Sequence, residues 1–213
     1  MPNWVVNKVT ILEGGEEFLK RATATFERKG ELFEEFVPVP ETYKLYDTTN
    51  HPNGKGLVIG EKYTSWPGSD FKGVGEIITQ QLIDEYKAAT KEQEEKYGVV
   101  GWYHFGCKYW GTKWDVSDFC VIRDEDMGTL EFSTAWSMPE GFYARISEMY
   151  PKMKFLVEYA DEDMGSNCGA VLFYNMSTID IDASTMYALT LHKYTPQDIW
   201  DYYSDNFEEE EEN

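Results

Sequence analysis

Cysteine and histidine are the first residues in this sequence that could do chemistry, because their side chains bind zinc. The chain contains His104-x-x-Cys107, followed at long intervals by Cys120 and Cys168. No two cysteines stand in a C-x-x-C pair, the spacing typical of structural zinc sites. We therefore expect three free thiols, as in a protein of a reducing cytosol, and no metal or other cofactor.

Closely spaced carboxylates are the second candidate. Three D-x-D pairs occur along the chain: Asp124/Asp126, Asp161/Asp163 and Asp180/Asp182. Their oxygens could hold Mg²⁺ or Ca²⁺, but no pair continues into a calcium loop with its terminal Glu. In a chain with 39 acidic residues, such pairs arise often from composition alone. The sequence also lacks G-x-S-x-G or another nucleophile signature, so it favours a protein without enzymatic activity.

Negative charge is concentrated in the second half of the chain. The whole sequence has 19 Lys and Arg against 39 Asp and Glu, a formal net charge of −20. Residues 1–114 hold 14 basic and 17 acidic residues (net −3), whereas residues 115–213 hold 5 and 22 (net −17). Nucleic-acid affinity depends on Lys and Arg that neutralise phosphates, so direct nucleic-acid binding is disfavoured.

Two interpretations of this charge stay open. It could be a solubilising surface, or an acidic face that docks on the basic surface of another protein. The residues that we expect to form such a face lie in two predicted loops: Asp124, Glu125, Asp126, Asp161, Glu162 and Asp163.

Nothing in the sequence indicates a membrane partner. No apolar run approaches the roughly 20 residues of a membrane span. The stretch Met1-Pro2-Asn3-Trp4 lacks the basic region and apolar segment of a signal peptide. We therefore expect a cytoplasmic protein.

A mixed fold must position these residues. The hydrophobic periodicity predicts strands at 4–12, 32–39, 116–123, 130–136, 155–159 and 170–174, and helices at 16–29, 76–96, 139–150 and 195–207. Residues 178–191 are ambiguous. This order indicates an α+β fold, a ferredoxin-like antiparallel sheet with helices on one face. A long insertion at about 41–100 follows the second strand, and an acidic C-terminal helix and tail end the chain. We expect a single domain at 1–207 and an acidic disordered tail at 208–213.

The strands at 116–123 and 130–136 enclose a turn-rich segment and predict a β-hairpin. If paired residue numbers sum to about 252, one face carries Trp114 with Met138, Val116 with Trp136, Asp118 with Thr134, Cys120 with Phe132, and Ile122 with Leu130. Eight of these ten residues are apolar, so we expect this face, with the ring of Trp114, in the core. Asp118 would then be a buried acid bonded to Thr134, in either a structural or a catalytic role. Trp110 precedes the strand, and its place stays open.

The open end of this hairpin is the alternative functional site. Lys113, Asp115, Thr134 and Ser137 would gather there beside aromatic rings. Converging polar groups next to apolar surface are typical of a small-ligand site or an active site.

Several separated motifs of the chain resemble a known family. They are Met1-Pro2-Asn3-Trp4 with Asn7, Trp110-Gly111-Thr112-Lys113-Trp114-Asp115, Phe132-Ser133-Thr134-Ala135-Trp136-Ser137 with Pro139, and Tyr150-Pro151 before Phe155-Leu156-Val157-Glu158-Tyr159. In this order they resemble the YubB-type ferredoxin-like domain family of bacteriophages and conjugative plasmids, over most of residues 1–176. The resemblance implies the fold and an origin in a mobile element, and it brings no settled activity.

The sequence thus leads to two hypotheses. The first is a non-enzymatic phage or plasmid accessory protein that acts by protein–protein contact, as an acidic inhibitor of a host or defence nucleic-acid-binding protein. The alternative is a small-ligand-binding protein or enzyme with its site at the open end of the 116–136 hairpin.

Overall fold

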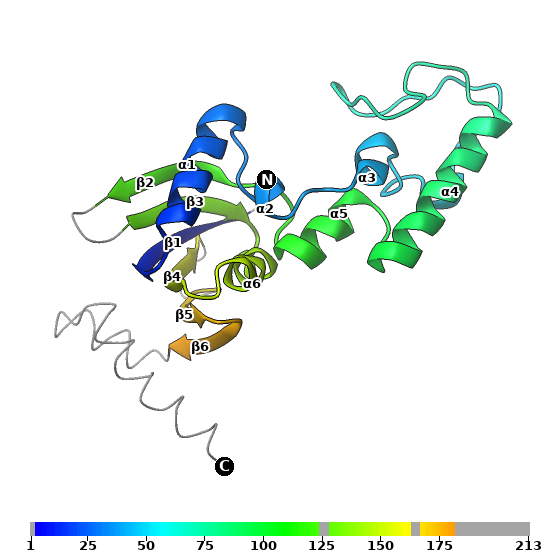
Figure 1. Ribbon diagram of the computed structural model, residues 1–213. Coiled ribbons are helices and arrows are strands. Elements are labelled where there is room, and N and C mark those ends of the chain that lie inside the picture. Colours follow the sequence, from blue (N-terminus) through cyan, green and yellow to red (C-terminus); the bar gives the residue numbers. More distant parts are fainter. Residues whose placement is uncertain (1–2, 124–127, 163–166, 182–213) are drawn as a thin grey trace, which may run out of the picture. The chain divides into compact units, whose positions relative to one another are not determined.

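The computed structural model describes residues 3–123, 128–162 and 167–181 (Figure 1). The chain divides into two compact units. Unit 1 comprises the residues up to Phe36 and those from Trp114 onward, and unit 2 comprises Val37–Lys113. The predicted insertion at about 41–100 falls within unit 2. The predicted helix at 195–207 and the tail at 208–213 lie outside the described residues.

Unit 1 is built on a six-stranded antiparallel sheet. Its strands are β1 (Trp4–Glu13), β2 (Ser117–Arg123), β3 (Gly128–Ala135), β4 (Lys154–Asp161), β5 (Gly169–Tyr174) and β6 (Ser177–Ile181), in the order β2-β3-β1-β4-β5-β6. Because β3 lies between β1 and β2, the first four strands form the split βαβ arrangement of a ferredoxin-like sheet. β5 and β6 extend the sheet beyond β4. The predicted α+β class with an antiparallel sheet is confirmed.

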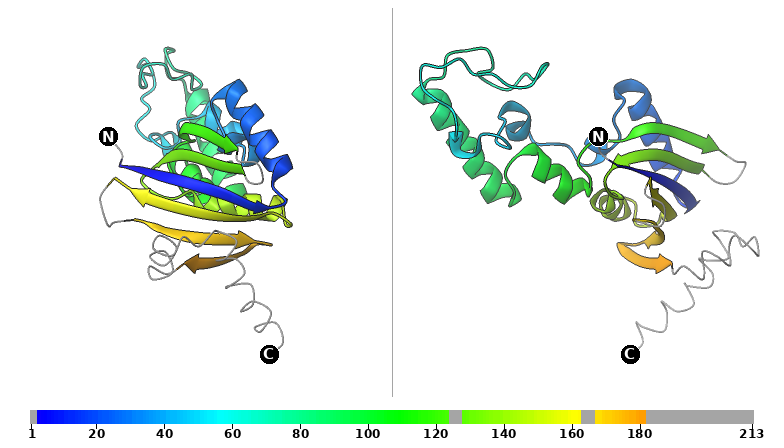
Figure 2. Two further views of the ribbon diagram at one scale, coloured as in Figure 1. Left: turned by 90° about the vertical axis from the view of Figure 1, so that its left-hand side faces the viewer. Right: turned by 180° about the vertical axis from the view of Figure 1, so that it is seen from behind.

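Helices of unit 1 cover one face of this sheet (Figure 2). They are α1 (Glu16–Lys29), α2 (Phe33–Phe36) and α6 (Glu140–Met149). α1 ends where predicted, at Gly30, which takes a left-handed φ of 70° and donates its N–H to Phe26 O at 2.8 Å. The layer between helices and sheet is aromatic: the rings of Phe33 and Phe142 lie 4.3 Å apart, and Phe155 stacks on Phe173 at 4.9 Å.

The predicted strand at 32–39 is wrong, because its first half forms α2. The cause is a contact distant in sequence. The carboxylate of Asp115 accepts hydrogen bonds from the backbone N–H groups of Leu32 (2.7 Å), Phe33 (2.9 Å) and Glu34 (2.9 Å). These are the N–H groups that a helix start leaves without partners, so the carboxylate stabilises a helical turn in an apolar sequence. The insertion therefore follows α2 and not a second strand.

The hairpin forms, but its predicted register is wrong. Ser117 pairs with Ser133, whereas Cys120 pairs with Glu131, so the register shifts within β2. Asp118 lies at this β-bulge with a φ of 52°. In an uninterrupted strand the predicted register would place alternate residues on one face, but one extra residue at the bulge exchanges the faces of the residues beyond it.

The bulge moves Asp118 and Cys120 from their expected places, and Trp114, which lies before β2, is not in the core either. All three residues are exposed, and the exposed fraction of Trp114 is 38%. Phe119 replaces them as the apolar contact of β2, with its ring 4.5 Å from that of Phe26.

Unit 2 is mainly helical. It contains α3 (Glu41–Leu45), a short 3-10 turn (Pro52–Gly54), α4 (Gln80–Tyr97), α5 (Trp102–Phe105) and a π-helical turn (Gly106–Trp110). The predicted helix at 76–96 is confirmed as α4, although it starts later, with Thr79 as its N-cap.

Buried polar contacts tie the parts of unit 2 together. The side chain of Gln93 is fully buried: its Oε1 accepts from Thr48 Oγ1 (2.6 Å) and from Gly101 N (3.0 Å). Its Nε2 donates to Thr42 O at 3.0 Å. Trp110 is buried as well, and its Nε1 donates to Val37 O at 2.9 Å. Trp110 is therefore a structural residue of unit 2.

Candidate functional site

Three tryptophans gather at the end of the sheet where β1 starts and β3 ends. The rings of Trp4 and Trp114 lie 6.4 Å apart, and Trp136 donates its backbone N–H to Asn3 O at 2.9 Å. Trp114 and Trp136 are 38% and 44% exposed. We call Trp4, Trp114 and Trp136, together with Asn3, Asp161, Glu162 and Asn167, the tryptophan end. Large apolar rings in contact with water are typical of binding surfaces.

Trp136 adopts an unfavourable backbone conformation there. Its φ of 71° is left-handed, which costs a bulky L-residue about 1–2 kcal/mol. Hydrogen bonds on both sides hold it: its N–H bonds to Asn3 O, and its carbonyl accepts from Asn167 Nδ2 at 3.0 Å. Backbone strain of this kind concentrates at functional sites.

Two of the predicted acidic residues belong to the tryptophan end. Asp161 accepts hydrogen bonds from Asn3 Nδ2 (3.4 Å) and Asn167 Nδ2 (3.1 Å). Glu162 Oε1 accepts from the backbone N–H of Trp4 at 3.0 Å. These hydrogen bonds hold both carboxylates at the tryptophan end. The other four residues of the predicted acidic surface, Asp124, Glu125, Asp126 and Asp163, lie outside the described residues.

The predicted ligand residues are only partly brought together. Thr134 Oγ1 donates to Ser137 O at 2.7 Å, so these two residues are neighbours. The carboxylate of Asp115 holds the start of α2 and the N–H of Val116 (2.8 Å). Lys113 belongs to unit 2, where its Nζ lies 5.9 Å from the ring centre of Tyr103.

A buried polar chain lies behind the tryptophan end. Asn7 Nδ2 donates to Thr134 Oγ1 (2.9 Å) and to Val5 O (3.0 Å), and the Tyr143 hydroxyl donates to Asn7 Oδ1 (3.2 Å). Burial raises the pKa of Tyr143 well above its usual value, so this phenol stays neutral. Every polar atom of the Asn7 side chain has a partner, which makes the chain a structural element and not a proton-transfer site. The alternating sequence pattern of β1 does not predict that Asn7, a polar residue, lies on the buried face of the strand.

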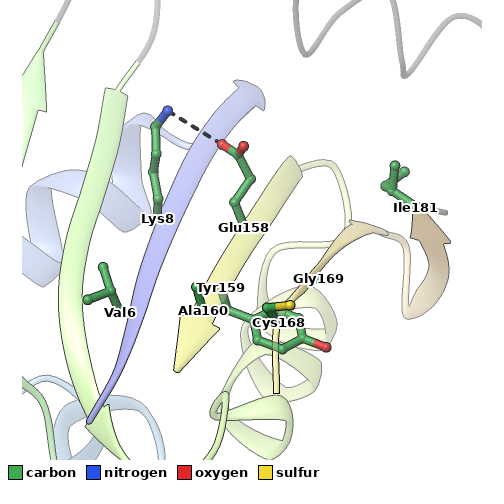
Figure 3. Close-up of a pocket in the computed structure, with 8 residues that line it drawn as sticks. All are labelled: Val6, Lys8, Glu158, Tyr159, Ala160, Cys168, Gly169 and Ile181. Carbon is green, nitrogen blue, oxygen red and sulfur yellow. Dashed lines mark ion pairs between the residues drawn. The ribbon is translucent and has the colours of Figure 1, made fainter. Parts of the chain in front are cut away.

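The sheet face opposite the helices carries a cavity of about 510 Å³. Figure 3 shows that Lys8 of β1 and Glu158 of β4 approach each other in it, at an Nζ–Oε2 distance of 3.4 Å. The rest of its lining is mainly apolar, with Val6, Ala160 and Ile181. The ion pair neutralises both charges. The cavity therefore suits an apolar group better than catalysis.

Charge differs sharply between the units. Unit 2 contains 10 acidic and 9 basic residues (net −1), which leaves −19 of the total −20 to unit 1. The three cysteines are free and exposed. In residues 3–123, 128–162 and 167–181, no group of three or more His, Cys, Asp or Glu side chains is placed to hold a metal ion. Within the same ranges, no helix combines the length and apolar character needed to cross a membrane.

Comparisons with known proteins indicate a relationship for the C-terminal part. A search of the curated proteins found no match. Among solved structures, the crystal structure of protein Api92 from Yersinia pseudotuberculosis is similar with a TM-score of 0.44 at 10% identity, covering 86% of this chain and 99% of that one. The family model "Ferredoxin-like domain in Api92-like protein" matches residues 109–212. Residues 109–212 are therefore similar to the ferredoxin-like domain in Api92-like protein.

Proposed function

We propose that this protein is a non-enzymatic accessory protein that acts by protein–protein contact, with the tryptophan end as its docking surface. The observation that carries the proposal is Trp136, a residue that is 44% exposed and has a strained backbone at a φ of 71°. Glycine would fit this conformation without strain. A strained tryptophan in contact with water is explained by a use for its ring, and tryptophan is enriched among residues that dominate binding energy.

The partner in this proposal has a basic surface. Asp161 and Glu162 belong to the tryptophan end, and unit 1 carries a formal net charge of −19. The electrostatic field of this negative charge speeds association with a basic surface and repels the phosphates of nucleic acids. Basic surfaces of this kind bind nucleic acids, so we propose inhibition of a host or defence nucleic-acid-binding protein. The resemblance of the sequence motifs to the YubB-type family supports a phage or plasmid origin and action in the bacterial cytoplasm.

Two matched variants test the docking surface. Trp136→Ala removes the exposed ring in unit 1, and Trp66→Ala removes a 43% exposed ring in unit 2. Each full-length protein, with the wild type, is used to capture proteins from host lysate at 50 and 300 mM NaCl, followed by quantitative mass spectrometry.

The expected result is a basic protein that wild type and Trp66→Ala capture at low salt. Trp136→Ala should capture at least about tenfold less of this protein, because a decrease of this size is expected when one hot-spot residue is lost. High salt should weaken capture by all three proteins. If both variants captured equal amounts of the partner, the proposal that the tryptophan end is the docking surface would be wrong. An acidic or salt-insensitive partner would contradict the charge argument.

A second candidate is the binding of a small apolar ligand in the cavity of Figure 3. The observation that favours it is the volume of about 510 Å³, within the range of small-molecule sites. Val6→Trp should fill the cavity and abolish binding of a small apolar ligand. The same variant should still capture a protein partner through the tryptophan end.

A further inference from the structure

The strand β2 lies at one edge of the sheet of unit 1. Among the described strands, β2 has a neighbour on one side only, which is β3 (Figure 1). In an antiparallel pair, alternate residues direct their backbone N–H and C=O groups away from the neighbouring strand. β2 therefore presents a row of backbone donors and acceptors with which a further strand can pair.

The bulge at Asp118 leaves most of this edge regular. Bulges in edge strands interrupt pairing and thereby hinder the addition of another strand. In β2 the register shift falls between Ser117 and Cys120, near the start of the strand. Beyond it, the four residues Cys120–Arg123 pair with β3 without a further shift. This part of the edge keeps the geometry that a further strand requires.

A groove of about 520 Å³ lies between this edge and α1, and we call it the edge groove. Its lining residues are Thr23, Phe26 and Glu27 of α1 and Phe119, Cys120 and Val121 of β2. The rings of Phe26 and Phe119 lie 4.5 Å apart, and both residues are half-buried. Domains that bind an extended peptide by strand addition combine a sheet edge with pockets for alternate side chains of the peptide. The edge groove and β2 have this combination.

The charge of the edge groove indicates the kind of segment that fits it. Glu27 lines the groove, and the exposed Asp118 directly precedes the lining residue Phe119. Three of the four basic residues of α1 pair with Glu35 of α2; they are Arg21, Arg28 and Lys29. The fourth, Lys20, is not among the residues that line the groove. The ionisable group in the lining is therefore a carboxylate, which complements a Lys or Arg side chain.

We propose that β2 accepts an extended basic segment of a partner protein as an additional strand. Because successive side chains of a strand point to opposite faces, every second side chain of this segment enters the edge groove. Apolar side chains then contact Phe26 and Phe119, and a Lys or Arg side chain lies near Glu27. The basic character of the partner rests on the proposed function.

The edge of β2 continues the tryptophan end. Trp114 lies three positions before Ser117, the first residue of β2, and Trp136 directly follows β3. A partner bound at the tryptophan end thus has the edge of β2 within reach of an adjoining extended segment. The two surfaces would act together on one partner, with the rings as anchors and the edge as the site of backbone pairing.

Three synthetic peptides test the strand addition with the full-length protein. The first is Lys-Val-Lys-Val-Lys-Val-Lys, seven residues like β2 itself, and the second has Glu in place of each Lys. The third is the lysine peptide with every backbone nitrogen methylated, which keeps the charge and removes the N–H donors. Binding is measured by fluorescence anisotropy at 150 mM NaCl. The wild type should bind the lysine peptide at least about tenfold more tightly than the other two, because only this peptide has both the charge and the backbone donors.

Two adjacent residues of α1 give matched variants. Thr23 lines the edge groove, whereas Ala24 is exposed and does not line it. Thr23→Lys places a positive charge in the groove and should weaken binding of the lysine peptide at least about tenfold. Ala24→Lys adds the same charge outside the groove and should stay within about twofold of wild type. Hydrogen exchange followed by mass spectrometry should show slower exchange in β2 when the lysine peptide binds the wild type or Ala24→Lys.

Several results would overturn the proposal. Equal affinity for the lysine peptide and its methylated form would show attraction by charge without strand pairing. Equal binding by Thr23→Lys and Ala24→Lys, or no binding of the lysine peptide by the wild type, would also contradict it. A wild-type dimer in sedimentation that Thr23→Lys dissociates would assign the edge to a second copy of the chain.

The tryptophan end and the edge of β2 can fail separately. Trp136→Ala should bind the lysine peptide as the wild type does, because the peptide spans β2 alone. A failure of the proposed function would appear as equal capture of partner by Trp136→Ala and Trp66→Ala. A failure of the strand addition would appear in the peptide measurements instead.

Discussion

The hydroxyl of Tyr143 donates a hydrogen bond to Asn7 Oδ1, at 3.2 Å, in a core that excludes water from both residues. The bond joins α6 to the central strand β1. Tyr143→Phe keeps the ring and leaves the amide oxygen without its donor, so it should lower the free energy of unfolding by about 1–3 kcal/mol. Urea unfolding measures this value. Tyr174→Phe, at a more exposed tyrosine of β5, should stay within about 0.5 kcal/mol of wild type, and equal losses would show that the buried bond adds nothing.

Alkaline pH should destabilise the protein through the same group. Burial raises the pKa of Tyr143 well above its usual value, and burial also raises the pKa values of Tyr43, Tyr63 and Tyr86 in unit 2. Above a pH of about 10 the unfolded chain loses these phenol protons, whereas the folded protein keeps them. Stability is therefore complete below this pH and falls above it, by up to about 1.4 kcal/mol per pH unit for each group. Urea unfolding between pH 8 and 11 checks the slope, which Tyr143→Phe should make shallower; a slope identical to wild type would contradict the assignment.

We expect Asp115 to stabilise the fold and to take no part in binding. Its carboxylate accepts four backbone N–H groups, from Leu32, Phe33, Glu34 and Val116. Asp115→Ala leaves these donors without a partner and should cost about 2–4 kcal/mol of unfolding free energy. Asp118→Asn, at an exposed acid nearby in sequence, is the control and should change stability by less than about 0.5 kcal/mol. If Asp115→Ala folded with wild-type stability and lost only partner capture, Asp115 would be a binding residue.

The β-bulge should respond to backbone preference at Asp118. At a φ of 52°, glycine is unstrained and valine is strongly disfavoured. Asp118→Gly should leave stability unchanged or raise it by up to about 1 kcal/mol, whereas Asp118→Val should lower it by about 1–2 kcal/mol. Both values come from thermal or urea unfolding. Equal effects of Gly and Val would mean that residue 118 does not keep its left-handed conformation in solution.

The regular elements of the fold could be predicted from local pattern. The alternation in β1, the apolar spacing of α1 with Gly30 at its end, and the spacing in α6 each specify an element without help from distant residues. The same holds for β4 and β5, whose apolar runs are bounded by turns.

The errors have tertiary causes. A carboxylate about 80 positions away converts the apolar stretch at 33–36 into a helix. A bulge at Asp118 shifts the hairpin, and no local rule predicts a positive φ at an aspartate. The tryptophan end assembles from the start of β1, the residues before β2 and the ends of β3 and β4, so only its acidic members Asp161 and Glu162 were identified from the sequence. Asn7 belongs to a sequence motif, but its buried role depends on Thr134 and Tyr143, which are distant in sequence.

The position of β1 at the centre of the sheet has a consequence for synthesis of the chain. Both of its neighbours, β3 and β4, come after residue 127, and all of unit 2 is made in between. At roughly 5–20 residues per second, about 115 residues separate the end of β1 from the start of β3 by roughly 6–23 s. During that time both edges of an apolar strand lack their partners on the nascent chain, while unit 2 emerges whole. The ribosome-bound intermediate with β1 unpaired is therefore the form of this protein most exposed to aggregation and to capture by chaperones.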